Sequence, residues 1–223
     1  MKSYALTIAL VGLSSLSLAA EKYAVKREAV DPPAELADGI RKLLPKECEA
    51  VSDGAGAFAR FWFRAELPGK ATAQQIKNGI TFQEVTETCV LGAVKFERAF
   101  IDFRKQEIAA GVYTLRLAYQ PDNGDHKDSA PHTEFALLVP ADKDTTADEM
   151  EPKTLYKLSF SSTGGEHPGV LLLYPGDGKA KEVKIQDRGS HVWTLNVPRT
   201  VLSPDGKADF GFGLTIAGWS KLR

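Results

Sequence analysis

Residues 112–120 have the sequence VYTLRLAYQ, and this stretch decides the fold class. Its side chains alternate between an apolar set that runs from Tyr113 to Tyr119 and a second set that includes Thr114 and Arg116. Successive side chains of a β-strand point to opposite faces, so this alternation predicts a strand. Turn-forming residues flank the stretch, with Gly111 before it and the run PDNG at 121–124 after it.

Outward from this strand, most of the chain has the same character. Two short helices are predicted, one between Asp31 and Pro45 from its apolar spacing, and one from Thr72 to Asn78 from a capping-box pattern. Residues 150–162 fit either a helix or a strand, and residues 141–149 fit a surface loop. Further strands are predicted at 57–67, 80–85, 89–96, 134–139, 169–174, 181–185, 191–197 and 209–217.

Many short strands separated by turns are typical of an antiparallel β-sandwich or a jelly-roll-like barrel. A parallel sheet would need a helix between most strands, and the sequence indicates only two. We therefore predict a mostly-β fold with one or two short helices, formed as a single domain by residues 21–223.

The first twenty residues have the layout of a secretory signal peptide. Lys2 precedes an apolar run from residue 5 to residue 18, and small residues lead to a cleavage position after Ala19 or Ala20. The run of about 14 residues is shorter than the roughly 20 that cross a bilayer as a helix. The sequence thus predicts a signal peptide at 1–20, a periplasmic or extracellular mature protein, and no integral membrane segment after cleavage.

The charge pattern argues against nucleic acid as a partner. Lys and Arg number 28 against 29 Asp and Glu, which gives a formal net charge of −1. The basic residues are spread along the chain, so the sequence shows no electrostatic footprint for nucleic acid or anionic lipid.

Two cysteines in an exported chain are most simply interpreted as a pair. A disulfide between Cys48 and Cys89 would close a loop of about 40 residues, which the chain-entropy relation values at roughly 4 kcal/mol. Two buried free thiols or a redox pair are the alternatives. Redox pairs usually have the close C-x-x-C spacing that is absent here, so a structural disulfide is predicted.

The segment PDNGDHKDSAPHTE at 121–134 is the richest in reactive side chains. Asp125, His126, His132 and Glu134 could supply carboxylate and imidazole ligands to a divalent metal ion such as zinc, iron or copper. Asp122, Asn123 and Asp125 could instead offer oxygen ligands to calcium, although the EF-hand spacing is not met. The third interpretation is a solvated turn, because Asp, Asn and Gly favour turns.

Other catalytic patterns are missing, and the aromatic residues allow two interpretations. The chain has no G-x-S-x-G motif, and none of its serines has a sequence context that would activate it. Bulky aromatics on alternating strands usually form the core, but the same residues could stack on sugar rings. The residues concerned are Trp62, Trp193, Trp219, Tyr119 and Tyr174.

Three stretches resemble a recurring pattern in exported bacterial proteins that carry a domain of unknown function. They are residues 110–140, 167–176 and 211–218, and the resemblance covers roughly 57–220. Its most specific piece is Gly124-Asp125-His126, followed by Ala130-Pro131 and Glu134-Phe135. The resemblance implies export and one domain, and it carries over no catalytic residues.

These observations favour a non-enzymatic β-sandwich protein of the cell envelope that binds a ligand or an envelope protein. Two alternatives stay open. One is a metal-dependent enzyme that uses His126, His132 and Glu134, and the other is a carbohydrate-binding accessory module.

Overall fold

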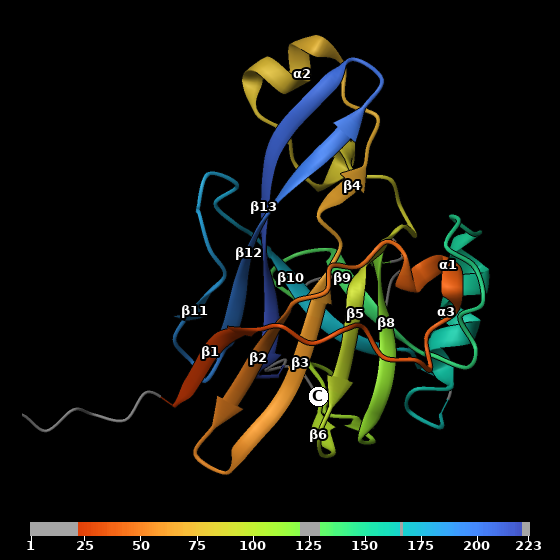
Figure 1. The fold of residues 1–223 in the computed structure, drawn as a ribbon, viewed down its shortest axis with the longest axis vertical. Helices are drawn as coiled ribbons and strands as arrows, with labels where there is room; N and C mark the ends of the chain where they lie inside the picture. The colour runs from red at the N-terminus through yellow and green to blue at the C-terminus, as the bar shows by residue number, and fades with distance from the viewer. Residues whose placement is uncertain (1–21, 121–129, 166, 220–223) are drawn as a thin grey trace, which may run out of the picture.

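The computed structural model describes residues 22–120, 130–165 and 167–219. The chain forms a mostly-β fold (Figure 1), which confirms the predicted fold class. The predicted signal peptide at 1–20 lies outside the described residues. Among the helices that are described, none is long and apolar enough to cross a membrane.

One large sheet dominates the described part of the chain. Its neighbouring strands pair antiparallel, apart from a short parallel pairing of β4 (Glu66–Pro68) with β12. A separate hairpin joins β6 (Phe100–Ile101) to β7 (Glu107–Ile108). In spatial order the large sheet contains β1 (Tyr23–Glu28), β2 (Cys48–Asp53), β3 (Gly56–Phe63), β5 (Val90–Phe96), β8 (Gly111–Tyr119), β9 (Glu134–Pro140), β10 (Gly169–Pro175), β13 (Gly206–Ala217), β12 (Trp193–Ser203) and β11 (Lys184–Asp187).

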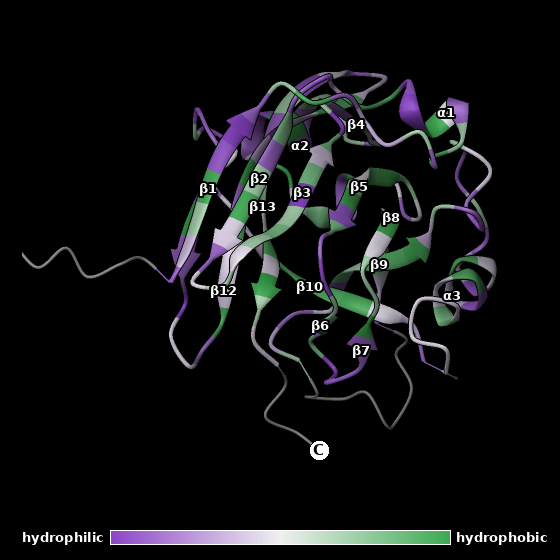
Figure 2. Ribbon diagram, turned by 60° about the horizontal axis from the view of Figure 1, so that its bottom comes forward, coloured by the Kyte–Doolittle hydropathy of each residue, from purple (hydrophilic) through white to green (hydrophobic). Residues whose placement is uncertain are grey.

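The large sheet curls into an open barrel. Its two edge strands, β1 and β11, come near each other on the same side of the molecule (Figure 1). Within the described residues, β1 pairs with β2 and β11 pairs with β12, so no ladder joins the two edges. We call this unpaired junction the seam. The inner face of the curl holds the main core, and hydrophobic bands run along its strands in Figure 2.

The helices cover the outer face of the barrel or lie at its end. α1 (Asp38–Arg41) belongs to a second core cluster, in which Ile40 packs with Trp62 of β3. α3 (Pro152–Phe160) lies over β9 and contributes Leu155 to a third cluster. α2 (Ala73–Asn78) sits beside the far end of the β12–β13 hairpin (Figure 1).

The second predicted helix is confirmed, and one predicted strand is wrong. Thr72 and Gln75 form the expected capping box at the start of α2, which ends before Gly79. Residues 80–85 form the short 3-10 helix η1 (Phe82–Glu84) in place of a strand. A second capping box, between Thr81 and Glu84, satisfies the N-terminal backbone groups of this turn.

A buried ion pair fastens the segment that the sequence indicated as a surface loop. Arg116 of β8 donates from Nε to Asp144 at 2.7 Å and from Nη2 to the same carboxylate at 2.9 Å. Its guanidinium also donates to backbone carbonyls of Thr88, Thr146 and Asp148. Both charged side chains are 0% exposed. Residues 144–148 therefore cover the polar face of β8.

The predicted disulfide between Cys48 and Cys89 is absent, because both thiols are free and buried. Cys48 lies on β2 and Cys89 directly precedes β5, with β3 between these strands. Strands lie about 4.8 Å apart, so two steps across the sheet exceed the roughly 7 Å that a disulfide can bridge between Cα atoms. The two side chains also belong to different core clusters, on opposite faces of the sheet.

We expect neither thiol to react with a maleimide in the native protein, and both to react in denaturant without reductant. Mass spectrometry of the alkylated protein checks this. A denatured protein that takes up no adduct would contradict the free thiols and support the predicted disulfide.

Burial raises the pKa of Cys89 from 9.0 to about 12. The folded state therefore holds this proton more tightly, and its stabilising contribution is lost as the pH rises from about 9 towards 12.

Candidate functional site

A pocket of about 360 Å³ opens at the seam of the barrel. It is lined by residues of β1, β2 and β3 on one side and by residues of β12, β13 and the 178–183 segment on the other. Its volume lies in the range of small-molecule sites, which favour clefts and the mouths of barrels. We call it the seam pocket.

One wall of the seam pocket is a cross-strand row of three residues. Arg27 is opposite Glu49 on β2, and Glu49 is opposite Phe61 on β3. Residues that face each other across antiparallel strands point to the same side of the sheet. Phe61 belongs to the inner core, so Arg27 and Glu49 also point inward.

Arg27 and Glu49 form an ion pair with two hydrogen bonds. The guanidinium donates to Glu49 Oε1 from Nη2 at 2.8 Å and from Nε at 3.1 Å. The Glu49 side chain is 9% exposed. The hydrogen bond from Arg27 to Glu49 is the main cause that raises the pKa of Arg27. This pair gives the wall a balanced charge.

Arg199 forms the opposite wall, and its charge is not balanced. It faces Phe210 of β13, a residue of the inner core, and its Cζ lies 5.3 Å from the centre of the Phe63 ring. One Nη donates to the carbonyl of Pro198. The Nε atom is buried and has no hydrogen-bond partner among the described residues. No described carboxylate lies within 4.0 Å of this guanidinium.

Burial lowers the pKa of Arg199 to about 10, against the opposing effect of Glu49. The side chain therefore stays protonated at neutral pH. A buried N–H without an acceptor costs roughly 1–3 kcal/mol, and more when the group is charged. Such an orphan in a folded protein calls for a partner or a function.

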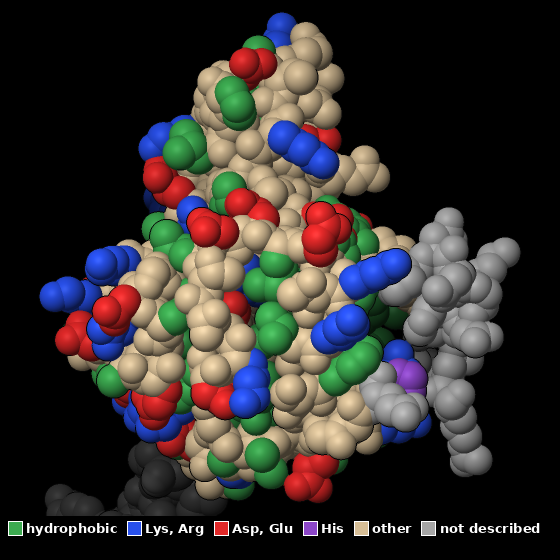
Figure 3. All heavy atoms as spheres, turned by 90° about the vertical axis from the view of Figure 1, so that its right-hand side faces the viewer, with side chains coloured by type: hydrophobic (Ala, Val, Ile, Leu, Met, Phe, Trp, Pro, Cys, Tyr) green, Lys and Arg blue, Asp and Glu red, His purple; other side chains and the backbone are tan. Residues whose placement is uncertain are grey.

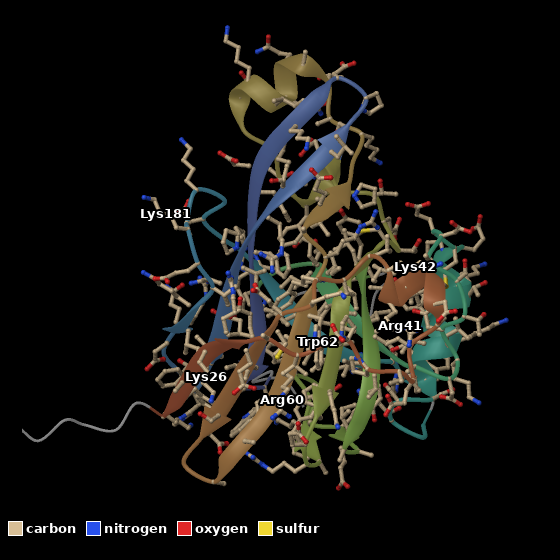
Figure 4. All side chains as sticks on the ribbon, in the orientation of Figure 1. Lys26, Arg41, Lys42, Arg60, Trp62 and Lys181 are labelled. Atoms are coloured by element: carbon tan, nitrogen blue, oxygen red, sulfur yellow. The ribbon has the colours of Figure 1, made fainter. Side chains whose placement is uncertain are left out.

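The rim of the seam pocket carries charges of both signs. Glu182 pairs with Lys184 at 3.2 Å, and Glu47 lies 3.9 Å from Arg27. Lys181, in the segment that precedes β11, extends away from the sheet (Figure 4) and has no ion-pair partner within the described chain. Asp209 is opposite Thr200, one position out of phase with the inward-facing Arg199 and Phe210.

The lining of the seam pocket combines apolar and charged side chains. None of the described lining residues is His, Cys or Ser. Apolar surface comes from Phe61, Phe63 and Val183, and polar recognition comes from Arg199. This combination of an apolar body with a few placed polar groups is typical of small-molecule sites.

The described residues of the predicted metal-binding segment do not line this pocket. Asp125 and His126 are outside the described residues. The ring of His132 lies edge-on to Tyr174, with centroids 4.7 Å apart, and Glu134 begins β9 opposite Tyr119. Where the chain is described, no three His, Cys, Asp or Glu side chains gather as a metal site would require. The metal site stays a prediction.

The candidate sugar-stacking aromatics have varied surroundings. Trp62 is fully buried, and Trp193 packs against Tyr23 with centroids 5.4 Å apart. The hydroxyl of Tyr119 donates to the carbonyl of Phe82. Trp219 is 52% exposed and stacks on His191. These contacts assign Trp62 to the core and leave Trp219 as the most exposed tryptophan.

The sequence carried a signal for Arg199 that was missed. In the strand WTLNVPRTVLS, the inward phase contains Leu195, Val197 and Val201, with Arg199 among them. A charge in the apolar phase of a strand is a violation of the pattern, and such violations concentrate at functional sites.

Fold and pocket together define an open, curled β-barrel with a ligand-sized pocket at its seam. No protein-family profile, curated protein sequence or solved structure matches the chain. The resemblance to exported bacterial proteins stays a prediction. Over the face shown in Figure 3, acidic and basic side chains are intermingled.

Proposed function

We propose that the protein is an exported binding module of the cell envelope that holds a small ligand in the seam pocket. The observation that carries this proposal is Arg199, which lines the pocket and whose buried Nε has no acceptor among the described residues. Export is supported by the signal-peptide pattern of residues 1–20.

Arg199 holds an inward position of β12 without a carboxylate partner among the described residues, and desolvation of its charge opposes folding. Its neighbours in the same phase of β12 are Val197 and Val201, which are buried. Replacing a buried ion pair by apolar side chains of similar volume is often neutral or stabilising by about 1–4 kcal/mol, and a desolvated charge without a counter-ion costs still more. A side chain that destabilises the folded state and lines a pocket is typical of a residue retained for ligand binding.

Arg199→Met is therefore expected to raise the free energy of unfolding by about 1 kcal/mol, because it removes a desolvated charge. Urea denaturation followed by fluorescence measures this change. Arg27→Met is the matched comparison, since it leaves Glu49 without its partner and is expected to destabilise the protein. A loss of stability in Arg199→Met as large as that in Arg27→Met would assign Arg199 a purely structural role.

Ligand binding is tested by ¹H–¹⁵N correlation spectra of the protein against a mixed library of small carboxylates, phosphates, amines and sugars. At least one compound is expected to shift the amide signals of Val183 and Arg199. Ala65→Trp fills the pocket mouth and should abolish these shifts. Ala55→Trp, at the opposite end of β3, should leave them unchanged. The proposal fails if no compound shifts these signals or if Ala65→Trp binds as well as the wild type.

A further inference from the structure

We infer that the ligand of the seam pocket carries an anionic oxygen group, a carboxylate or a phosphate, and that Arg199 binds it. This inference rests on the proposed function. It names the chemistry of the ligand and the residue that selects it.

The free edge of the Arg199 guanidinium has the right shape for two oxygen atoms. Nε–H and one Nη–H of an arginine lie parallel, and this fork matches carboxylate and phosphate oxygens. The other known contacts of Arg199 are its bond to the Pro198 carbonyl and its position over the Phe63 ring. Neither contact supplies an acceptor to Nε. An anionic oxygen in the pocket would complete the fork.

None of the carboxylates that line the seam pocket forms an ion pair with Arg199 among the described residues. Glu49 is held by Arg27 in two hydrogen bonds, and Glu182 is paired with Lys184. Glu47 lies nearest to Arg27, and Asp209 is out of phase with Arg199. Arg199 is therefore an inward-facing cation of the pocket without an ion-pair partner among the described residues.

Two further features suit a small amphipathic anion. Lys181 at the rim adds a second positive charge without a described partner, which would draw an anion towards the pocket. Phe61, Phe63 and Val183 offer apolar surface beside Arg199. A ligand with an anionic head and a short apolar or aromatic body would use both.

The test uses the whole mature protein and five probes: benzoate, phenyl phosphate, inorganic phosphate, neutral benzyl alcohol and cationic benzylamine. The readout is the Arg199 Nε–H resonance, together with affinities from the backbone amide shifts. Benzoate or phenyl phosphate is expected to shift the Nε–H signal downfield and to bind more tightly than the two non-anionic aromatics. The affinities of these two anions show whether the pocket prefers a carboxylate or a phosphate. The difference in affinity between phenyl phosphate and inorganic phosphate measures the contribution of the apolar ring.

Arg199→Gln should weaken anion binding roughly 10- to 100-fold, which is the value of a charge-assisted contact. Arg199→Lys, which keeps the charge and loses the fork, should bind with intermediate affinity. Lys26→Gln is the matched control. It removes the same charge from the neighbour of Arg27, on a side chain that is 75% exposed (Figure 4). This control should bind within about twofold of the wild type, because exposed charges contribute little.

If benzyl alcohol or benzylamine binds as tightly as benzoate, the inference of an anionic ligand is overturned, while the proposed binding function of the pocket stands. Unchanged anion affinity in Arg199→Gln would have the same meaning. If neither the five probes nor the library shifts any pocket signal, the proposed function fails together with the inference.

Discussion

Replacement of Arg116 by methionine should lower the free energy of unfolding by about 3–5 kcal/mol, because it leaves the Asp144 carboxylate buried without its counter-ion. The Thr114 hydroxyl would be the remaining side-chain donor to this carboxylate. Arg116 and Asp144 are both 0% exposed and are joined by two hydrogen bonds. The same guanidinium also holds three backbone carbonyls, two of them in the segment that covers β8. Chemical denaturation measures the loss, and hydrogen exchange should show residues 144–148 opening first.

Two further variants separate the charge effect from a general loss of packing. Asp144→Asn keeps the shape of the side chain and removes its charge, so it should also destabilise the protein. The double variant Arg116→Met with Asp144→Leu should recover part of the loss, because it leaves no unpaired buried charge. Arg41→Met, at an exposed salt bridge to Asp38, should change stability by less than about 0.5 kcal/mol. A similarly small effect of Arg116→Met would show that the buried Arg116–Asp144 ion pair does not hold residues 144–148 against β8.

Trp62→Ala is the second change with a large expected effect. Trp62 is 1% exposed, packs with Ile40 and Leu36, and donates from its indole nitrogen to the carbonyl of Val30 at 2.8 Å. Removal of such a side chain from a core costs about 3–5 kcal/mol. Thermal unfolding should show the loss, and residues 30–45 should become accessible to limited proteolysis.

The exposed tryptophan provides the control for this prediction. Trp219→Ala should change stability by less than about 0.5 kcal/mol, since 52% of that residue already faces solvent. Trp62→Phe keeps most of the apolar surface and loses the hydrogen bond, so its effect should be intermediate. Equal losses in Trp62→Ala and Trp219→Ala would show that Trp62 does not anchor α1 to the barrel.

The strands with strong alternation or long apolar runs could be predicted from the sequence, and the weakly patterned ones could not. Residues 112–120 and 134–139 correspond closely to β8 and β9 because their side chains pack on the barrel core. β1 and β2 were missed. β1 has charged residues at three of its six positions, and its partly exposed burial pattern leaves little apolar periodicity.

The position of Asp144 was also beyond sequence reasoning. The stretch ADKDTTADE at 141–149 is polar throughout, and its composition indicates a solvated loop. Only the tertiary fold places Asp144 against Arg116, some 28 residues away along the chain. A buried ion pair of this kind leaves no local pattern.

The candidate site was missed because its residues are dispersed along the sequence. Arg27 and Glu49 lie on the paired strands β1 and β2, and Arg199 of β12 comes near them only when the sheet curls. The prediction instead favoured the loop at 121–134, where reactive side chains are adjacent in sequence.

A crystal structure of the protein soaked with benzoate would test the central claim most directly. The account predicts benzoate in the seam pocket, with a carboxylate oxygen about 2.8–3.0 Å from Arg199 Nε. The ring should lie against Phe61 or Val183. Benzoate bound elsewhere, or Arg199 paired with a carboxylate of the protein itself, would contradict it.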